Sequence, residues 1–501
     1  MKLKTLDELE KIVETSEKKV ILCHGVFDLF HLGHLTHLKD AKKYADILIV
    51  TVTPDIYVNK GPGRPVFSER QRAEIIASLE LVDYVGINEF PTAEETILKL
   101  KPDYFAKGAE FDNKSDLDGA VLREKEVIES VGGQMIYTTD EVVYSSSNLI
   151  NNFNYSLLTP EADAYLKDFR NNYTEEEVFS YLDKIKDTTV LVIGDAIIDE
   201  YVYGQAIGKS SKDPTLVIQE NRSEIYAGGS LAVANHISEF CKKVILITYI
   251  GENGEHEDFI KSSLHNNIEF HFIYKKNSPT IVKKRFIDEY FGNKLLESYK
   301  INQEPLDSDQ EKELIDLIDT YLPQSELALV SDFGHGLMEN NVIHRICSTQ
   351  NYLAVNAQCN AGNLGYNFIS KYFKGNLFVI DEKELRMETR DRFSSIFKLL
   401  QQCYYKVNCD KIIVTRGSNG SDLCCDSNTY FCPALATKIV DRVGAGDAFF
   451  AIASLASYVD APPDIISFLG NVAGSLGVQI IGNKKHITEM DLRKSIHYLM
   501  K

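Results

Sequence analysis

The architecture of the first part of this chain follows from HGVFDLFHLGHLTHLKDAKKYAD, residues 24–46. This stretch comes after the apolar run VILC and before ILIVTV at 47–52, so it predicts a strand, a turn, a helix and a second strand. It carries His24 and the evenly spaced His31, His34 and His37. Such histidines fit a metal site, a helix that merely carries them, or a site for phosphate.

The context favours phosphate. Histidines at this spacing rotate around a helix and do not converge on one zinc ion, and no acid or cysteine stands nearby at ligand spacing. A helix start, in contrast, offers free N–H groups and the positive end of the helix dipole. Gly33 lets phosphate approach the backbone, and the imidazoles of His31 and His34 can donate hydrogen bonds to it. We expect His37 to pack, and His24 receives no role.

The composition limits the classes of protein to which this chain can belong. The 501 residues exceed what one core usually supports, and 54 basic against 73 acidic residues give a formal net charge of −19. A nucleic-acid groove or an anionic membrane patch is therefore not expected. The nine scattered cysteines form no CxxC, the N-terminal residues predict a charged helix without signal-peptide character, and apolar runs stay short. These features predict a cytoplasmic protein.

The pattern along the chain predicts two α/β domains. Apolar runs and helical patterns alternate through 19–137, which is typical of a parallel sheet covered by helices. Residues 156–188 are helical, with Pro160 after Thr159 and a capping box from Thr174 to Glu177. A new series of strands starts at TVLVIGDAIID, 189–199. We therefore predict domains at 1–155 and 189–501, joined by a helical linker at 156–188.

A second candidate site lies in DRVGAGDAFFAIASLA, 441–456, a turn followed by an apolar helix. Gly444, Ala445 and Gly446 could present consecutive N–H groups to an anion, and Asp447 could accept a proton from an attacking hydroxyl. The alternative is a tight turn whose aspartate only favours the helix dipole.

Three further motifs support this second site. GDAIIDEYVYG at 194–204 places Asp195 and Asp199 just beyond a strand, where carboxylates could bind sugar hydroxyls. AGGSLAVAN at 227–235 supplies Gly228 and Gly229 for close approach of a sugar. VTRGSNG at 414–420 is a strand that runs into a glycine turn, which suits a nucleotide.

The first part resembles the cytidylyltransferase-like nucleotidyltransferases, whose HxGH matches His31, Gly33 and His34. KGPGRPVFSERQR at 60–72, PDYFAKGAEFD at 102–112 and YSSSNLI at 144–150 appear in the family's order. The resemblance spans roughly 19–152 and is strongest to the adenylyltransferase half of the bacterial heptose 7-phosphate kinase / heptose 1-phosphate adenylyltransferases. It implies a Rossmann-like domain in which a sugar phosphate oxygen attacks the α-phosphorus of a nucleotide, with Mg²⁺ on the phosphates.

This resemblance also assigns residues. His31 and His34 would hold the triphosphate and stabilise the transition state, and Lys107 would meet the acceptor's phosphate. The residues implied for the nucleotide are Gly25, Phe27, Gly33, Lys60, Arg72, Ser145, Ser146 and Ser147. For Lys60 and Arg72 a solvated surface charge is the alternative, and Asp28 is open to being a turn residue only.

Residues 189–498 resemble the ribokinase-like (PfkB-type) sugar kinases, again closest to the heptose-phosphate branch. The resemblance implies an α/β sandwich with a small β lid, with Asp447 as the base and Gly444, Ala445 and Gly446 as the anion hole. The implied sugar residues are Asp195, Asp199, Gly228 and Gly229, with Lys283 and Arg285 of SPTIVKKRF for a phosphate already on the substrate. Thr415 and Gly417 would lie by ATP, and Glu384 would act on a metal indirectly.

The chain departs from this family at several points. Ala232 replaces the asparagine after the paired glycines, and Asp381 replaces the asparagine of Asn-x-x-Glu. Asn356-Ala357-Gln358 stands where heptose kinases carry Asp-Pro-Lys, and the transferase comes first in the chain. Because of these departures the identity of the sugar stays open, and a kinase of reduced activity is an alternative. Asp447 and its glycines are intact.

The leading hypothesis is a bifunctional sugar-activating enzyme. The kinase would phosphorylate a sugar, of the heptose 7-phosphate type, at its anomeric hydroxyl with ATP, and the transferase would join the sugar 1-phosphate to ATP or CTP. The alternatives are an alditol-phosphate cytidylyltransferase fused to an unrelated carbohydrate kinase, and a transferase with a non-catalytic, sugar-binding regulatory half. A class I tRNA synthetase shares HxGH, but the sequence has no KMSKS-like element. We expect sugar phosphates and nucleotides as partners, and a homo-oligomer is left open.

Overall fold

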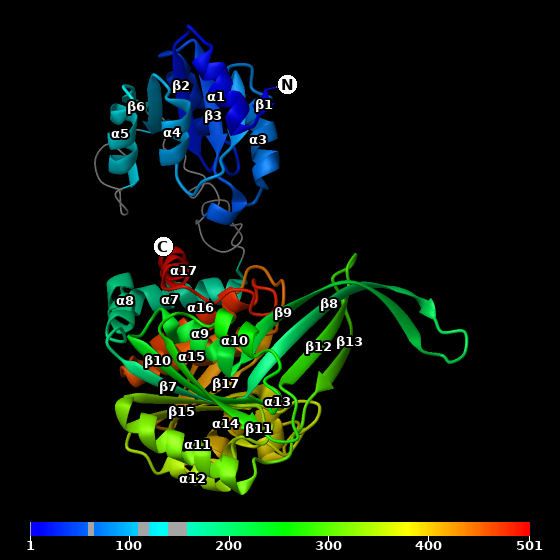
Figure 1. Cartoon of the computed structure of the whole chain (residues 1–501). Coiled ribbons are helices and arrows are strands. Elements are labelled where there is room, and N and C mark those ends of the chain that lie inside the picture. The colour runs from blue at the N-terminus through cyan, green and yellow to red at the C-terminus, as the bar shows by residue number, and fades with distance from the viewer. Residues whose placement is uncertain (1, 59–64, 109–119, 139–157) are drawn as a thin grey trace. The chain divides into compact units, whose positions relative to one another are not determined.

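The computed structural model describes residues 2–58, 65–108, 120–138 and 158–501. The chain forms two compact units, Met1–Leu157 and Leu158–Lys501 (Figure 1). Each unit is described by itself below.

The first unit is built on a parallel sheet of six strands in the order β1-β4-β3-β2-β5-β6. Its elements are β1 Leu3–Lys4, α1 Leu6–Glu14, β2 Val20–Gly25, α2 Leu32–Lys42, β3 Ile47–Val52, a 3₁₀ turn η1 Asp55–Tyr57, α3 Glu69–Ala77, β4 Tyr84–Ile87, α4 Glu94–Leu100, β5 Tyr104–Gly108, α5 Ala120–Ser130 and β6 Gln134–Thr138. Apolar residues of α2 and α3 pack in one core, and those of α1, α4 and α5 pack in another. Helices thus cover both faces, as predicted for a Rossmann-like domain.

The strand order indicates where a ligand is expected to bind in this unit. β3 and β4 lie on one side of β2, whereas β5 and β6 lie on the other. Connections that leave β2 and β5 at their carboxyl ends therefore diverge, which opens a crevice between them, and ligands of open α/β sheets bind at such points. The histidine-bearing turn follows β2 directly.

The second unit is a larger α/β domain. Its main sheet has nine strands in the order β11-β10-β7-β14-β15-β16-β17-β18-β19, parallel except for β18 and β19. Helices α11 to α14 contribute to the core on one face, and α7 to α10 with α15 to α17 to the core on the other. This arrangement confirms the predicted α/β sandwich.

The elements of this unit have the following bounds: α7 Pro160–Asn172, α8 Glu175–Asp183, β7 Thr189–Gly194, β8 Ala196–Lys209, β9 Leu216–Gly229, α9 Ser230–Ser238, β10 Lys243–Gly251, α10 Glu257–Ser263, β11 Ile268–Lys275, β12 Ile281–Asp288, β13 Lys294–Lys300, α11 Ser308–Tyr321, β14 Leu327–Asp332, α12 Asn340–Cys347, β15 Tyr352–Ala357, β16 Gly375–Asp381, α13 Glu382–Thr389, α14 Ile396–Lys406, β17 Cys409–Thr415, β18 Ser421–Cys425, β19 Asn428–Cys432, α15 Ala445–Tyr458, α16 Pro463–Gly477 and α17 Glu489–Met500. Three short 3₁₀ turns complete it, η3 Leu322–Gln324, η4 Ile369–Lys371 and η5 Gly417–Asn419.

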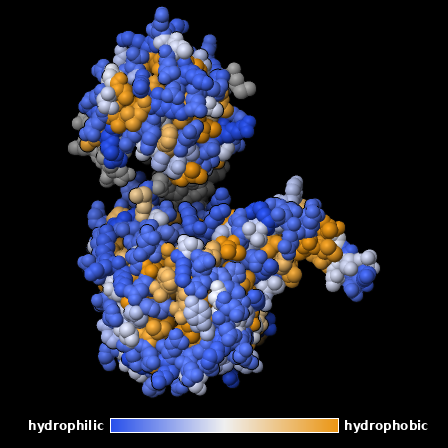
Figure 2. Space-filling model, in the orientation of Figure 1, coloured by the Kyte–Doolittle hydropathy of each residue, from blue (hydrophilic) through white to orange (hydrophobic). Residues whose placement is uncertain are grey.

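A second, four-stranded sheet forms the predicted lid, in the order β13-β12-β8-β9. β8 and β9 each have 14 residues, and their distal halves are exposed, so they project as a long hairpin (Figure 1). Apolar side chains on this sheet face solvent, and Figure 2 shows them along the projecting arm. The most exposed are Ile207, Leu216 and Leu296 on the strands, with Tyr290 and Phe291 in the turn between β12 and β13.

The segment expected as a linker is part of the second unit instead. The ring of Phe169 on α7 stacks on Phe468 of α16 with centroids 4.4 Å apart, and Arg170 donates to the carbonyl of Leu499. On α8, Glu175 pairs with His497 of α17. The helix-start signals at Pro160 and Thr174 predicted the two helices but not their packing, and their apolar stripe is buried in this core.

Across the described ranges, no helix has the length and apolar character needed to cross a membrane. All nine cysteines fall within those ranges and are free thiols.

Candidate functional sites

The histidine-bearing turn caps α2. The N–H of Gly33 donates to Nδ1 of His31 (3.1 Å), and the N–H of His31 donates to Nδ1 of His34 (3.4 Å). The two rings stack with centroids 3.9 Å apart. Because each Nδ1 accepts a backbone N–H, the proton of each neutral imidazole resides on Nε2. This is the tautomer that can donate a hydrogen bond to an anion at the helix start.

The backbone before this helix is strained. Phe27 and Leu29 have φ values of 52° and 47°, in the left-handed region that residues other than glycine rarely adopt. The ring of Phe27 meets His34 edge-on at 5.3 Å, and a Cβ on Gly25 would lie 3.2 Å from that ring. Strain of this kind persists where the surrounding structure enforces it, typically at a functional site.

Asp28 and Arg72 hold the turn in place. Asp28 is 1% exposed and accepts the N–H groups of Val66 (2.9 Å) and Phe67 (3.1 Å), so it is more than a turn residue. Arg72 is also 1% exposed, which rules out a solvated surface charge. Its guanidinium donates to the carbonyls of Val26, Thr53 and Phe67 and pairs with Asp55.

These contacts occupy four of the five N–H groups of a guanidinium. The structure therefore places Arg72 under the turn as a positioning residue and does not bring it to an open phosphate site. Lys60, Ser145, Ser146 and Ser147 lie outside the described residues.

Lys107 lies at the end of β5, beside β2 across the crevice. Its Nζ is 2.7 Å from Oε2 of Glu124, which is itself buried. Burial, with a smaller contribution from Lys107, lowers the pKa of His24 to about 3 and that of His37 to about 4. His24 bonds Thr51 and Thr53, and His37 bonds Thr138. These two histidines are therefore neutral packing residues and not partners of the His31–His34 pair.

In the second unit, the polar candidates gather at the carboxyl ends of the central strands. Asp195 follows β7, Gln358 follows β15, and Thr415 ends β17. α15 lies against β15 and β16, and Asp447 in its first turn contacts Gln358. The residues from 194 to 447 that the motifs predicted are thus brought to one edge of the sheet, where ligands of parallel sheets bind.

The GAGD loop has the geometry of an anion site. Gly444 caps α15 with φ 84°, and a Cβ there would lie 1.9 Å from Oδ1 of Asn483, so only glycine fits. A Cβ on Gly446 would meet no described atom within 4 Å outside its own helix, so the space beside Gly446 in the first turn is open. Ala445 is the first helical residue. The loop can therefore receive an anion at the positive end of α15.

Asp447 lies beside this opening. It is 8% exposed, and burial together with the nearby carboxylate of Asp199 raises its pKa to about 7. Oδ1 accepts a hydrogen bond from Nε2 of Gln358 (3.2 Å), which lowers the pKa, as does Lys283. A carboxylate whose pKa lies near the working pH suits proton acceptance.

The paired glycines make room for protein atoms. A Cβ on Gly228 would lie 2.2 Å from Oδ2 of Asp199, and one on Gly229 would lie 2.4 Å from the carbonyl of Asp195. Gly229 also has φ 59°. We predicted that these glycines admit a sugar, but in the structure they first admit Asp199 and the backbone of Asp195.

Arg285 and Lys283, predicted to meet a substrate phosphate, differ from each other. Arg285 pairs with Asp199 and also with Glu297 (3.1 Å), so its charge is engaged by two acids. Lys283 is 6% exposed, its Nζ lies 5.0 Å from the ring centre of Phe333, and burial lowers its pKa. Of the two, Lys283 is the better placed to meet a ligand.

Asp195 is fully buried, and one of its two carboxyl oxygens accepts a hydrogen bond. Its Oδ2 accepts the N–H of Phe333 (2.8 Å), whereas Oδ1 has no hydrogen-bond partner among the described residues. Burial and the charge of Asp332 raise the pKa of Asp195 to about 7. A buried, unpaired carboxyl oxygen is costly unless something binds it, which fits a role toward a ligand hydroxyl.

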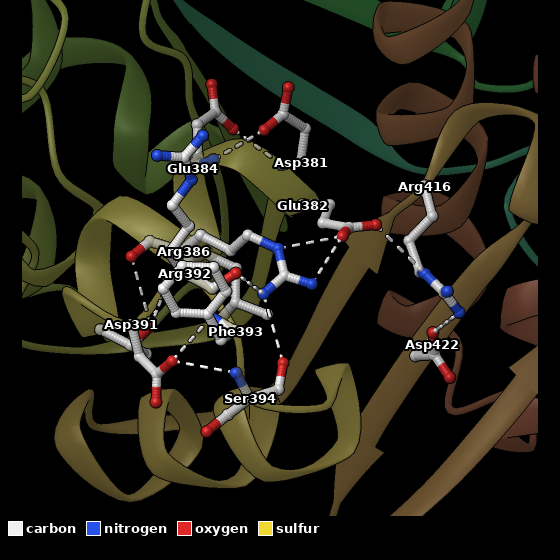
Figure 3. A network of polar contacts seen from close by, with 12 residues as sticks. Asp381, Glu382, Glu384, Arg386, Asp391, Arg392, Phe393, Ser394, Arg416 and Asp422 are labelled. Atoms are coloured by element: carbon white, nitrogen blue, oxygen red, sulfur yellow. Dashed lines mark hydrogen bonds and ion pairs between the residues drawn. The ribbon is translucent and has the colours of Figure 1, made fainter.

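The predicted nucleotide edge carries a network of charged groups. Gly417 is exposed with φ 55°, next to Thr415. Arg416 bridges Glu382 of α13 (3.4 Å) and Asp422 of β18 (3.0 Å), and Arg386 binds the same Glu382 (Figure 3). The network ties the glycine turn to the start of α13.

Glu384 and Asp381 form a capping box at the start of α13. Asp381 accepts the N–H of Glu384, and the two oxygens of Glu384 accept the N–H groups of Asp381 and Cys359, each at 2.7 Å. Burial and the charge of Asp381 raise the pKa of Glu384. Asparagine caps helices as aspartate does, so this departure from the family keeps the local fold. Asp381 is exposed, whereas both carboxyl oxygens of Glu384, the residue predicted to act on a metal indirectly, accept backbone N–H groups.

Gln358 is the residue of this site that sequence reasoning missed. We noted it only as a departure from the family, yet its amide contacts Asp447. The available signal was its position, a polar residue directly after the apolar run of a predicted strand.

Comparison with known proteins agrees with this division of the chain. Residues 22–152 match the cytidylyltransferase-like family, and residues 370–486 match the pfkB family of carbohydrate kinases. The bifunctional protein HldE of Bradyrhizobium diazoefficiens is 27% identical over 317 residues, which cover 62% of this chain and 63% of that protein. HldE of Helicobacter pylori is 40% identical over 138 residues, 27% of this chain and 29% of that protein.

The second unit also has solved relatives of the same fold. Phosphofructokinase-2 from Escherichia coli aligns over 63% of this chain and 100% of its own, with a TM-score of 0.51 and 16% identity. The chain spans less than two thirds of the length of these two curated relatives. Along the chain, a region that matches the cytidylyltransferase-like family is thus followed by one that matches the pfkB family of carbohydrate kinases.

Proposed function

We propose that this chain is a bifunctional enzyme of nucleotide-sugar biosynthesis. Its second unit transfers the γ-phosphoryl group of ATP to the anomeric hydroxyl of a sugar, of the heptose 7-phosphate type. Its first unit then condenses the sugar 1-phosphate with ATP or CTP to give an NDP-sugar and pyrophosphate. The kinase product carries the anomeric phosphate that the transferase uses. A substrate that already bears a phosphate gives a bisphosphate, from which a separate phosphatase would remove the other phosphate before the transfer.

The observation that carries the proposal is the placement of Asp447. The carboxylate stands at the first turn of α15, beside the open space at Gly446. In the kinase step it takes the proton of the sugar hydroxyl while that oxygen attacks the γ-phosphorus, and ADP leaves. The N–H groups at the start of α15 stabilise the charge on the phosphoryl oxygens. Asp195, Asp199 and Lys283 hold the sugar.

In the transferase step, an oxygen of the sugar 1-phosphate attacks the α-phosphorus and pyrophosphate leaves. The Nε2–H groups of His31 and His34 donate to the phosphate oxygens at the start of α2, where charge develops. Lys107, once drawn from Glu124, meets the acceptor's phosphate. Lys60 and the serines 145 to 147 complete this site in the proposal. Mg²⁺, when bound, would neutralise the nucleotide phosphates in both steps.

The alternatives differ in their products. An alditol-phosphate cytidylyltransferase would use the same His31 and His34 but a different acceptor. A regulatory second unit would bind sugar without consuming ATP. Ala232 is 2% exposed in α9, so this position has no side-chain amide to offer a sugar, as the regulatory alternative would allow.

The experiment is a product panel with the full chain. ATP, CTP, GTP and UTP are each incubated with heptose, hexose, pentose and alditol phosphates, and products are identified by mass spectrometry. An ADP- or CDP-sugar together with ADP supports the proposal. Products from alditol phosphates alone would move the function to the first alternative, and Asp447→Asn chains that phosphorylate sugar normally would remove the kinase assignment.

A further inference from the structure

Gln358 links the end of β15 to the start of α15. Its Nε2 donates to Oδ1 of Asp447 (3.2 Å) and to Oδ1 of Asn356 (2.6 Å). Asn356 is 6% exposed and is itself fixed, because its Nδ2 donates to the carbonyl of Val379 on β16 (2.8 Å). A primary amide has two N–H groups. Both are engaged, so the orientation of the Gln358 side chain is set.

The backbone of Gln358 is held as firmly. Its N–H donates to the carbonyl of Asp332 (2.8 Å), and its carbonyl accepts Nδ2 of Asn367 (3.0 Å). The next N–H, that of Cys359, donates to Glu384 (2.7 Å). Contacts near the carboxyl ends of β14, β15 and β16 thus fix the backbone of Gln358. Its side chain extends from there to Asp447.

The groups around Asp447 act on its negative charge in opposite directions, so a neutral hydrogen-bond donor is what can hold it in place. Among the described residues, Asp199 on β8 repels its negative charge and Lys283 on β12 attracts it, while burial disfavours it. Neither of these two groups donates a hydrogen bond to Asp447 in the structure described here. The amide of Gln358 is neutral, so its donation to the carboxylate does not change with pH.

We propose that Gln358 is a positioning residue for Asp447, which holds Oδ1 so that Oδ2 faces the sugar hydroxyl and accepts its proton. The inference rests on the proposed kinase function and adds to it the device that orients the base. In this chain an amide thus supports Asp447 from the position after β15.

The test is Gln358→Met, which keeps the length of the side chain and removes both donors. Gln324→Met serves as the matched control, since the amide of Gln324 is exposed and donates only to the carbonyl of Thr320. We expect kcat of the kinase reaction to fall about tenfold or more, since a small displacement of a reacting group has effects of this size. We expect KM for the sugar to change little, and the transferase reaction of the same chain to be unchanged.

The pH profile separates positioning from general damage. The hydrogen bond from Gln358 favours the ionised form of Asp447, so its loss raises the pKa of that carboxyl. The acidic limb of kcat/KM therefore moves to higher pH in Gln358→Met. Asn356→Ala, which keeps Gln358 but removes the acceptor that orients it, moves the limb the same way by less.

Two outcomes overturn different claims. If Gln358→Met and Asn356→Ala fold, as judged by thermal unfolding, and keep the wild-type kcat and acidic limb while Asp447→Asn is inactive, the positioning role is wrong and the kinase function stands. If Asp447→Asn phosphorylates sugar as well as the wild type, the proposed function itself fails. An equal loss in Gln324→Met also overturns the positioning role.

Discussion

Gly228 on β9 faces the carboxylate of Asp199 on β8 so closely that a Cβ would lie 2.2 Å from Oδ2. Asp199 is thereby free to pair with Arg285 and to lie within the field of Asp447. The lack of a side chain at Gly228 on β9 thus determines where the buried carboxylate of Asp199 lies on the neighbouring strand β8.

Gly228→Ala is expected to displace Asp199 and to impair the kinase reaction. We expect KM for the sugar to rise about tenfold to a hundredfold, because the sugar-facing carboxylate shifts. The measurement is steady-state kinetics with the sugar varied. Gly474→Ala in α16 is the control, since a Cβ there meets its nearest atom at 3.7 Å. Similar kinetics for both variants would contradict this reading of Gly228.

Arg72→Met is expected to destabilise the first unit by about 2–3 kcal/mol or more, chiefly because it leaves the carbonyls of Val26, Thr53 and Phe67 without the donor that Arg72 supplies. Hydrogen exchange of β2 under increasing urea measures this loss. Arg70→Met, two residues earlier on an exposed side chain, should change stability by about 0.5 kcal/mol or less. If the two variants unfold alike and only Arg72→Met loses the transferase reaction, Arg72 acts on phosphate and not on the fold.

His34→Ala should lower kcat of the transferase reaction about a hundredfold or more, the usual effect of losing one preorganised donor to developing charge. His37→Asn should leave that reaction close to wild type, since His37 bonds Thr138 and not His34. Nucleotide consumption in the presence of a sugar 1-phosphate measures both. Equal losses in the two variants would mean that the histidines act as a set.

The stability of the first unit should fall with acid. His24 and His37 have pKa values of about 3 and 4 in the folded chain, below the usual value of about 6.5. Below pH 6.5 both histidines therefore become protonated in the unfolded chain but stay neutral in the folded chain. Each histidine then lowers the free energy of unfolding by about 1.4 kcal/mol per pH unit. Stability is complete above that pH and is lost as the pH falls towards 4.

Urea unfolding of the first unit at pH 7, 6 and 5 measures this slope. His37→Asn should remove about half of it, because one of the two protons is no longer bound on unfolding. A slope that is unchanged by His37→Asn would place the acid sensitivity elsewhere.

Local sequence signals predicted much of the framework. The capping box from Thr174 to Glu177 and the start of α7 at Pro160 occur where the sequence placed them. The helix that begins beside His31 is likewise present. Signals of this kind depend on residues three or four apart, so they can be read without knowing the tertiary structure.

The functions of buried polar residues could not be read in this way. The partners of Arg72 are up to 46 residues away, and those of Gln358 up to 89, so no local pattern distinguishes them from surface side chains. The helices expected as a linker likewise gave no sign that their apolar stripe meets α16 and α17. Long-range packing decided each of these cases.

The most direct test of the central claim follows both reactions in one tube by ³¹P NMR. The full chain is given a sugar phosphate of the heptose 7-phosphate type, ATP and CTP. With a phosphatase added that removes the 7-phosphate, we predict that a sugar 1,7-bisphosphate signal appears first and becomes a sugar 1-phosphate with release of inorganic phosphate. That signal then gives way to an NDP-sugar and pyrophosphate. Asp447→Asn should stop the sequence at the start, and added sugar 1-phosphate should restore it. An NDP-sugar formed by Asp447→Asn without added sugar 1-phosphate would contradict the account.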